Sequence, residues 1–238
     1  MDTIKVPFKN VKMVAHRGVS SLEKENSMAA FIAAGNRSYY GIECDIHATL
    51  DGKYVVLHDA DTLRVAGVSL NVENAPFEEV RKVKLLDING KPRGDLTIPT
   101  LQEYLSVCHR YHKVSVLELK SNFTVEQLNE IIQIIQNEGH LEETVFISFI
   151  LENLIQLRKL LPKQPLQYLT GEFNDELVKT LRNYQLDLDI HHSQITAKRV
   201  SALHEMGILV NCWTVDNLSD AVLLQESGVD FITSNVLE

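Results

Sequence analysis

The sequence YGIECDIHATLDGKYVVLHDAD occupies residues 40–61 and combines a strand pattern with a turn signal. Apolar and ionisable residues alternate through its first half, in the order Ile42, Glu43, Cys44, Asp45, Ile46 and His47. Successive side chains of a β-strand point to opposite faces, so this order predicts one apolar face and one acidic face. The apolar face is expected to meet covering helices, which leaves Glu43 and Asp45 on the inner side of the sheet.

A hairpin is predicted in the second half of the same stretch. Asp51-Gly52 is a strong signal for a two-residue turn between antiparallel strands. The residues expected to face each other are then Leu50 and Lys53, His47 and Val56, and Asp45 and His58. The returning segment 55–58 is therefore expected to bring His58 back beside Asp45.

Short β-rich segments alternate with helical patterns along the chain. Eight strands are expected, at 11–16, 40–45, 114–119, 144–148, 165–169, 186–190, 208–213 and 230–234. Helices are expected at 27–34 behind an Asn26 cap, 101–112, 124–138, 151–160, 175–184, 197–206 and 217–226. Eight strand–helix units with right-handed crossovers predict an α/β fold that closes as a (β/α)8 TIM barrel. A doubly wound open sheet is the alternative, although the sequence has no G-x-G-x-x-G or P-loop pattern to favour it.

Length, charge and cysteine content narrow the class of protein. A chain of 238 residues suits one α/β barrel, and a net charge of -9 opposes non-specific binding to nucleic acid or an anionic membrane. The amino-terminal sequence lacks signal-peptide features and no apolar run reaches transmembrane length, so a cytoplasmic location is expected. The three cysteines have no C-x-x-C spacing, which argues against a disulfide framework or a zinc site.

Three acids are expected at one end of the barrel. Glu118 alternates with two leucines on the third strand, as Glu43 and Asp45 alternate with apolar residues on the second. Carboxylates buried together are costly unless a cation compensates, so these three predict a site for a hard metal ion. Oxygen ligands with room for waters suit Mg²⁺ or Ca²⁺ better than Zn²⁺. The alternative is that the acids form salt bridges with Lys120 or Arg17, or lie on a solvated rim.

The first strand ends in AHRG, residues 15–18, which places His16 and Arg17 at the carboxyl end of a barrel strand. TIM barrels hold their catalytic groups at this end. The planar fork of an arginine suits a phosphate group, and Gly18 allows a sharp turn. A purely structural histidine is the alternative for His16 taken alone, but two histidines and three acids are expected to converge at the same mouth.

Taken in order, these motifs resemble those of the glycerophosphodiester phosphodiesterase family. The matching elements are H-R-G (16–18), E-N-S (25–27), E-x-D (43–45), T-x-D-G (49–52), H-D (58–59), I-P-T-L (98–101), E-x-K (118–120), W-T-V (213–215) and G-V-D-F-I-T (228–233). The family usually has E-N-T where this chain has E-N-S. Single motifs of this kind are weak, but the ordered set is specific and spans nearly the whole chain.

The resemblance implies a metal-dependent barrel enzyme that hydrolyses glycerophosphodiesters, the deacylated phospholipids, to sn-glycerol 3-phosphate and an alcohol. By position it implies metal ligands Glu43, Asp45 and Glu118, acid/base histidines His16 and His58, phosphate-binding Arg17 and Lys120, and Trp213 lining the pocket. The metal is expected to be one Mg²⁺ or Ca²⁺ ion. Within a single domain of residues 1–238, the resemblance also implies an insertion at about 59–97, with a helical-looking segment at 74–83, that caps the active-site mouth.

The expected chemistry follows from the charge of a phosphodiester, which repels nucleophiles. A metal ion with Arg17 or Lys120 is expected to neutralise charge that develops on the phosphate oxygens. One histidine would act as base on a water or on the glycerol 2-hydroxyl, and the other would protonate the leaving alkoxide. The sequence leaves open which histidine plays which part, whether a cyclic phosphate forms, and which head group is preferred.

Other functions remain open from the sequence. A phospholipase or sphingomyelinase-like phosphodiester lyase uses related chemistry, a Schiff-base aldolase could use Lys120 as nucleophile, and a silent barrel could only bind phosphate. The chain stops at residues 235–238, too soon for a full helix after the eighth strand. The last helix is thus expected to be missing or supplied by a neighbouring chain, which makes a homo-oligomer one expectation.

Overall fold

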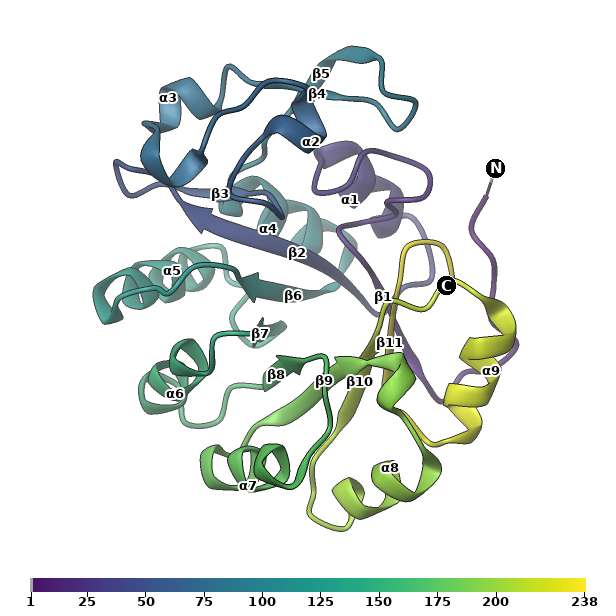
Figure 1. Cartoon of the computed structure of the whole chain (residues 1–238). Coiled ribbons are helices and arrows are strands. Elements are labelled where there is room, and N and C mark those ends of the chain that lie inside the picture. The colour runs from purple at the N-terminus through teal and green to yellow at the C-terminus, as the bar shows by residue number, and fades with distance from the viewer. Residues whose placement is uncertain (1) are drawn as a thin grey trace.

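The computed structural model describes residues 2–238, and within them eight parallel strands form a closed ring (Figure 1). In ring order the strands are β1 (Lys12–Ala15), β2 (Gly41–Ala48), β6 (Val114–Leu119), β7 (Thr144–Ser148), β8 (Leu166–Thr170), β9 (Asp187–His191), β10 (Val210–Trp213) and β11 (Phe231–Ser234). Because β1 pairs with both β2 and β11, the sheet has no open edge within the ring. The fold is the predicted TIM barrel rather than a doubly wound sheet.

Seven longer helices surround the ring and cover its outer face (Figure 1). They are α1 (Met28–Gly35), α4 (Leu101–Tyr111), α5 (Val125–Asn137), α6 (Leu151–Leu160), α7 (Asp175–Tyr184), α8 (Ala197–His204) and α9 (Leu218–Glu226). In residues 2–238 no helix follows β11. The last residues instead pair with the amino-terminal segment, where the Ile4 amide donates to the Val236 carbonyl at 3.0 Å. No helix of this part of the chain is both long and apolar enough to cross a membrane.

Side-chain alternation divides the barrel into two cores. Ile42, Cys44 and Ile46 are fully buried in the outer core, which the surrounding helices complete. A smaller apolar cluster lies inside the ring and consists of Val14, Val116, Val145, Ile147 and Leu169. Val116 precedes Glu118 by two residues on the same strand face, so this apolar layer supports the charged side chains at the carboxyl ends of the strands.

The hairpin after β2 exists, but its predicted register is wrong by one residue. β3 (Tyr54–Val56) pairs antiparallel with β2, and His47 faces Val55 rather than Val56. The Thr49 amide donates to the Lys53 carbonyl and Gly52 has φ +73°, so the loop contains three residues and ends in a left-handed glycine. Asp45 therefore pairs with Leu57, whose amide donates to the Asp45 carbonyl at 3.0 Å, and not with His58.

The predicted Asn26 cap of α1 is also wrong. Ser27 is the N-cap residue, and its side chain accepts a hydrogen bond from the Ala30 amide. Asn26 has φ +53°, a backbone conformation that asparagine tolerates better than most residues. Its side chain is thereby free to donate to Asp45 Oδ2 at 2.7 Å, which makes it part of the acidic site.

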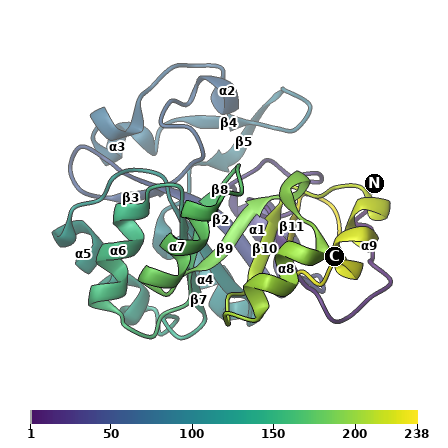
Figure 2. The same cartoon turned by 60° about the horizontal axis from the view of Figure 1, so that its bottom comes forward.

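The residues between β3 and α4 form several short elements beside the barrel. They are α2 (Leu63–Ala66), η1 (Val72–Asn74), α3 (Phe77–Val80), β4 (Lys84–Leu86) and β5 (Pro92–Thr97). Of the helical-looking segment 74–83, only four residues form α3, because Pro76 holds Ala75 in extended backbone. Figures 1 and 2 show these elements together at one side of the barrel, next to α1, β2 and β3. They pack around their own small core, which includes Val65, Val72 and Leu85.

Candidate active site

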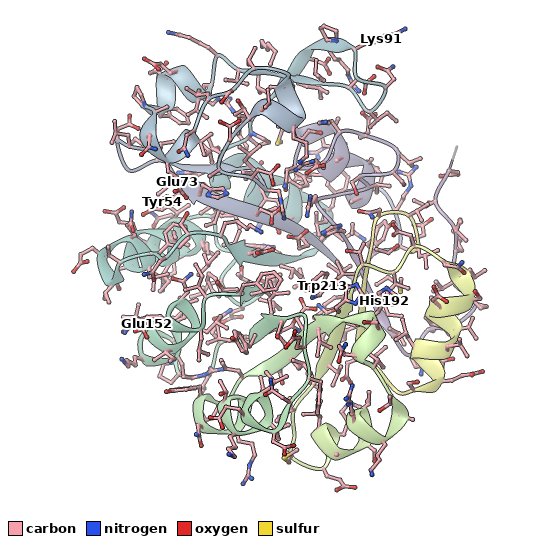
Figure 3. The ribbon with its side chains drawn as sticks, viewed as in Figure 1. Tyr54, Glu73, Lys91, Glu152, His192 and Trp213 are labelled. Carbon is pink, nitrogen blue, oxygen red and sulfur yellow. The ribbon has the colours of Figure 1, made fainter. Side chains whose placement is uncertain are left out.

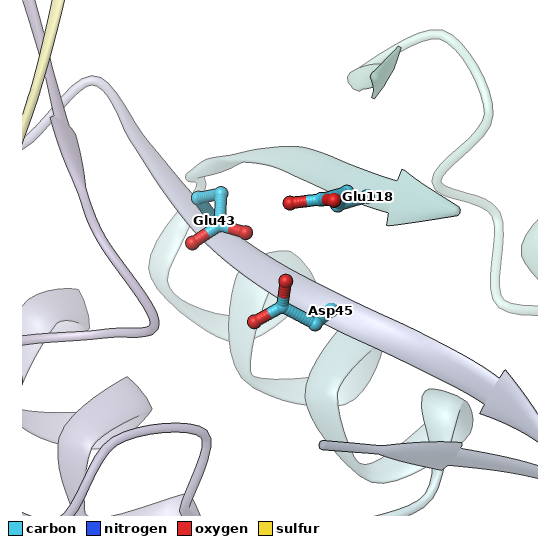
Figure 4. A group of neighbouring side chains, drawn as sticks. All are labelled: Glu43, Asp45 and Glu118. Atoms are coloured by element: carbon cyan, nitrogen blue, oxygen red, sulfur yellow. The ribbon is translucent and has the colours of Figure 1, made fainter. Parts of the chain in front are cut away.

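The three predicted acids converge at the carboxyl ends of β2 and β6. Asp45 and Glu118 are direct partners in the strand register, and Glu43 lies two residues earlier on β2. Figure 4 shows the three carboxylates directed toward one another, and one oxygen from each lies within 4.8 Å of the others. All three side chains are buried. Asp45 Oδ1 has no hydrogen-bond partner within residues 2–238, so the cluster offers an unused ligand atom and fits a divalent metal site.

Two cationic side chains contact the acids. Lys120 Nζ lies 2.8 Å from Glu118 Oε1 and 3.5 Å from Asp45 Oδ1, and Arg17 Nε lies 3.4 Å from Asp45 Oδ2. The salt bridges to Lys120 and Arg17 that the sequence left as an alternative therefore exist, and the three acids converge as well. Two cations do not balance three carboxylates, and a divalent ion would supply the missing positive charge.

The pKa values of the acids show this imbalance. Burial and the neighbouring Asp45 charge raise the pKa of Glu118 to about 8, and burial with the two acidic neighbours raises that of Glu43 as well. Burial also raises the pKa of Asp45, but the charges of Arg17 and Lys120 outweigh it and lower the value to about 2. Burial and mutual repulsion therefore disfavour three negative charges at this position, and a bound cation would relieve that repulsion.

Arg17 is held in place by its backbone as well as its side chain. It has φ +55°, and its amide donates to Glu43 Oε2 at 2.8 Å. Its guanidinium donates to Glu25 Oε1 at 2.9 Å, while Nε is buried without a hydrogen-bond partner. Gly18 follows with φ +77°, and a side chain there would meet the Ala30 backbone at 2.6 Å. The H-R-G turn is consequently built to bring the Arg17 amide and guanidinium to the acids.

His16 is supported by an asparagine from the end of the chain. Its Nδ1 lies 2.8 Å from Asn235 Oδ1. The orientation of the Asn235 amide follows from its other contacts, because Nδ2 donates to Asp216 Oδ2 at 2.6 Å. Nδ1 of His16 therefore carries the proton and donates it to Asn235, leaving Nε2 as the acceptor. Burial and the Arg17 charge lower the pKa of His16 to about 4, so the ring is neutral at pH 7.

His58 is supported by a carboxylate. Its Nδ1 lies 2.7 Å from Asp59 Oδ1, and Arg64 of α2 donates from Nε to Asp59 Oδ2 at 2.5 Å. Arg64 also donates to both oxygens of Glu25, at 2.7 and 2.9 Å. Burial and the charges of Arg17 and Lys120 lower the pKa of His58, against the opposing effects of Asp45 and Asp59. One arginine of the inserted segment thus contacts the acid that orients His58 and the acid that holds Arg17.

A cavity of about 260 Å³ opens at this end of the barrel. Its lining includes six of the eight predicted site residues, namely His16, Arg17, Glu43, His58, Glu118 and Trp213. Asp45 and Lys120 are not in the lining, and both contact residues that are. Trp213 lies at the centre of the ring of strands in Figure 3, packed edge to face against Phe149 at 5.7 Å between ring centroids. A larger open groove of about 750 Å³ lies beside β3 and α5 and contains none of the predicted residues.

Several residues of this site were not expected from the sequence. Asn235, Asp216 and Arg64 come from loops or short elements and act through side-chain hydrogen bonds, which leave no regular pattern, whereas Glu25 belongs to the E-N-S motif at 25–27. Asp189 of β9 also lines the cavity, and it did carry a signal. It alternates with Leu188 and Ile190 in the same way that Asp45 alternates with Cys44 and Ile46.

Similarity to known proteins agrees with this geometry. The model of the glycerophosphoryl diester phosphodiesterase family matches residues 16–238. A glycerophosphodiester phosphodiesterase of Bacillus altitudinis is 29% identical over 230 residues, covering 93% of each chain. That of Caldanaerobacter subterraneus is 28% identical over 227 residues, covering 94% of this chain and 93% of the relative.

Solved structures agree as well. A glycerophosphodiester phosphodiesterase from Parabacteroides distasonis is 28% identical, with a TM-score of 0.78 over 95% of this chain and 93% of the other. An Oleispira antarctica phosphodiesterase, solved in complex with its product sn-glycerol 3-phosphate, has a TM-score of 0.86 at 24% identity, over 94% of this chain and 93% of the other. At that identity the likeness concerns the fold. The family match spans nearly the whole chain, so the predicted enzyme class is confirmed and this protein belongs to the glycerophosphoryl diester phosphodiesterase family.

Proposed function

We propose that this protein hydrolyses glycerophosphodiesters to sn-glycerol 3-phosphate and an alcohol. The observation that carries the proposal is the convergence of two histidines, two cations and three acids on one cavity at the carboxyl ends of the barrel strands. The names of its relatives support the same substrate class, since those from Bacillus altitudinis and Parabacteroides distasonis are glycerophosphodiester phosphodiesterases.

The size of the cavity favours a deacylated substrate. Its volume of about 260 Å³ is below the range of roughly 300–1,000 Å³ that is typical for drug-sized ligands. A glycerophosphate group with a small alcohol suits such a space, whereas two acyl chains would need an extended apolar channel. Glycerophosphocholine and glycerophosphoethanolamine are therefore the proposed substrates.

Glu43, Asp45 and Glu118 are proposed to hold one divalent cation. Three carboxylates without histidine or thiolate ligands favour Mg²⁺ or Ca²⁺ over Zn²⁺. When bound, such an ion polarises the phosphate oxygens and balances the excess carboxylate charge. Arg17 and Lys120 border the same acids and are proposed to bind the phosphate, where they neutralise charge that develops on its non-bridging oxygens.

His16 is proposed as the general base. Its Nδ1 proton is engaged by Asn235, and the neutral ring presents Nε2 as a proton acceptor. It would take the proton from the attacking oxygen, which belongs either to a water or to the glycerol 2-hydroxyl. Attack by the hydroxyl gives a cyclic phosphate and releases the alcohol, and water then opens the ring.

His58 is proposed as the general acid. The Asp59 carboxylate accepts the hydrogen bond from His58 Nδ1 and, being an anion, stabilises the imidazolium form more strongly than the neutral Asn235 amide does for His16. His58 would donate its other ring proton to the departing alkoxide as the phosphorus–oxygen bond breaks. Positioned proton transfer of this kind typically contributes about 10²–10⁴-fold to the rate.

The inserted segment of about residues 59–97 is proposed to cap the mouth of the cavity. Arg64 of α2 supports this role through its contacts to Asp59 and Glu25, which border the site. The neighbouring element η1 adds a second link, because Glu73 Oε1 lies 2.8 Å from Nδ1 of His47 on β2.

Turnover of a substrate panel tests the proposed function. The metal-stripped protein is mixed with glycerophosphocholine, glycerophosphoethanolamine or an acylated lysophospholipid, and then with Mg²⁺ or Ca²⁺. We expect metal-dependent release of sn-glycerol 3-phosphate from the first two and little from the third. Glu43→Gln should raise the metal concentration required. Turnover insensitive to chelation, or accumulation of a cyclic phosphate as the final product, would contradict the metal-dependent hydrolase and favour a different chemistry.

A further inference from the structure

Asp189 of β9 is a carboxyl that the mechanism above does not use. It is 2% exposed and lines the cavity together with Ile147, Leu169 and Thr233. Its Oδ1 is buried and has no hydrogen-bond partner within residues 2–238. The side chain thus lies at the inner side of the active-site cavity with an unsatisfied acceptor.

The polar side chains next to Asp189 form hydrogen bonds with one another and not with Asp189. Asn211, its register partner on β10, donates from Nδ2 to Gln167 Oε1 at 3.1 Å and accepts from the Thr233 hydroxyl at 3.3 Å. On the other side, the register partner is Leu169, which offers no polar side-chain group. Burial and the Glu118 charge raise the pKa of the Asp189 carboxyl. No protein group within residues 2–238 thus compensates this acid, and a buried polar group left unpaired destabilises the fold.

Asp189 does not belong to the metal cluster. The group of ligand atoms within 4.8 Å of one another consists of Glu43, Asp45 and Glu118, and Asp189 is outside it. A residue that is costly to bury and has no structural partner is best explained by a ligand that completes its hydrogen bonds. That ligand must bring a hydrogen-bond donor into the part of the cavity between the metal cluster and the apolar floor.

We propose that Asp189 is a specificity-determining residue that binds a hydroxyl of the glycerol group of the substrate. This inference rests on the proposed function and adds which arm of the diester enters the barrel. With the phosphate held near Arg17 and Lys120, the glycerol arm points inward to Asp189. The second alcohol points outward past Trp213 and Phe149, where the wall is aromatic and Phe149 is 46% exposed.

Hydroxyl chemistry fits this position better than an ammonium head group. A substrate hydroxyl carries one O–H, which can donate to the unpartnered Oδ1 of Asp189, and it brings no formal charge that must be desolvated. A choline head group has no N–H to donate, and an ammonium ion would lose its hydration beside the apolar Ile147 and Leu169. An inward glycerol also leaves the outer alcohol free to vary, which predicts tolerance of different head groups.

Equilibrium binding tests the proposal without requiring turnover. Calorimetry with the Mg²⁺-loaded protein would compare sn-glycerol 3-phosphate with ethyl phosphate, which has the phosphate but no hydroxyls, and with phosphoethanolamine, which has an ammonium group. We expect the wild type to prefer sn-glycerol 3-phosphate over ethyl phosphate by about 10–100-fold, the range for a hydrogen bond to a charged group. In Asp189→Ala this preference should fall to nearly 1, while the affinity for ethyl phosphate changes less than twofold.

Two further variants separate this role from a structural one. Asp189→Asn keeps the shape and should retain part of the preference, because an amide still offers a carbonyl acceptor. Asp187→Asn is the matched control on the same strand, since Asp187 accepts from the Leu209 amide and does not line the cavity. It should leave the preference unchanged. Thermal unfolding of metal-free Asp189→Asn should match or exceed that of the wild type, because an uncompensated acid has been removed.

Each contrary result has a distinct meaning. An unchanged preference for sn-glycerol 3-phosphate in Asp189→Ala overturns the proposal. So does a selective loss of phosphoethanolamine affinity, which would assign Asp189 to a cationic head group. Failure of the proposed function would appear differently, as a wild type that leaves glycerophosphodiesters intact, and the binding preference would still be measurable.

Discussion

His16 and His58 lie at the same cavity but are supported by regions of different chemistry. His16 follows the first strand of the barrel and is held by the neutral amide of Asn235, which follows the last strand. The Asn235 amide in turn donates a hydrogen bond to Asp216. The hairpin and the inserted segment hold His58 through the Asp59 carboxylate, which Arg64 contacts. A neutral support suits the proposed base and an anionic support suits the proposed acid, so the proposed assignment depends on the surroundings of the two histidines and not on their shared position at the mouth of the barrel.

Removal of either imidazole gives the largest expected effect. His16→Ala and His58→Ala should each lose about 10²–10⁴-fold in kcat on glycerophosphocholine, because a proton transfer is lost in each case. Both variants should stay folded and bind metal, since neither ring contributes to the acidic cluster. Steady-state kinetics at saturating Mg²⁺ measures the loss, and His204→Ala, a surface histidine paired with Asp230, is the matched control.

A diester with a 4-nitrophenyl leaving group sharpens the comparison. Nitrophenolate departs without a proton, so removing the general acid should lower kcat only slightly on this substrate. Removing the general base should lower kcat as much as it does on glycerophosphocholine. His58→Ala should therefore recover most activity on it and His16→Ala should not. Recovery by His16→Ala alone would reverse the assignment, and near wild-type activity of both variants on glycerophosphocholine would remove both roles.

Sequence patterns predicted the barrel and the acidic cluster because both follow from strand alternation. Asp45 and Glu118 are direct register partners on adjacent parallel strands, so recognising both strands was enough to bring these acids together. The hairpin register could not be read in the same way. Asp-Gly suits a two-residue turn, but the chain uses a three-residue loop with Gly52 in the left-handed region, and this choice depends on tertiary contacts.

The supports of the two histidines were not predictable from the sequence by comparable means. Asn235 and Asp216 follow different strands and meet only when β10 and β11 pair. Arg64 reaches Glu25 across 39 positions of sequence, through a flexible side chain of an element only four residues long. Such contacts depend on the final position of loops rather than on periodicity, which explains why His58 was predicted and Arg64, which contacts its partner Asp59, was not.

The pH dependence of activity gives an intermediate effect. As a base, His16 must be unprotonated, and its pKa of about 4 places the loss of that form far below the usual value of 6.5. We expect kcat/KM not to fall between pH 7 and about 5, because His16 stays neutral there and the protonated fraction of the proposed acid His58 grows, and to fall about tenfold per pH unit only below about 4. A bound cation nearby would lower this pKa further, so a metal-saturated pH–rate profile tests the expectation. An acidic limb near pH 6.5 would contradict it.

The free energy of unfolding of the metal-free protein should also depend on the protonation of His16. The unfolded chain binds the His16 proton near pH 6.5, whereas the folded protein binds it only near pH 4. The stabilisation is therefore complete above pH 6.5 and is lost progressively as the pH falls toward 4. Thermal unfolding at pH 7 and pH 5 should show a smaller decrease for His16→Gln than for the wild type.

The smallest expected effect concerns Arg64, the link between the inserted segment and the site. Arg64→Ala removes the contacts to Asp59 and Glu25, and we expect kcat to fall about 10-fold with little change in KM, the lower end of the 10–100-fold range for residues that orient active-site ligands. The partial loss is expected because Asp59 still contacts His58 and Glu25 still contacts Arg17. Arg64→Lys should recover only part of the activity, because an ammonium cannot bond both acids in the same forked geometry.

If Arg64 merely stabilised the segment, Arg64→Ala would lower the melting temperature and leave the kinetics at 25 °C unchanged, and the 4-nitrophenyl substrate would then show no selective rescue. If Arg64 acts through His58, that substrate should rescue Arg64→Ala as it rescues His58→Ala.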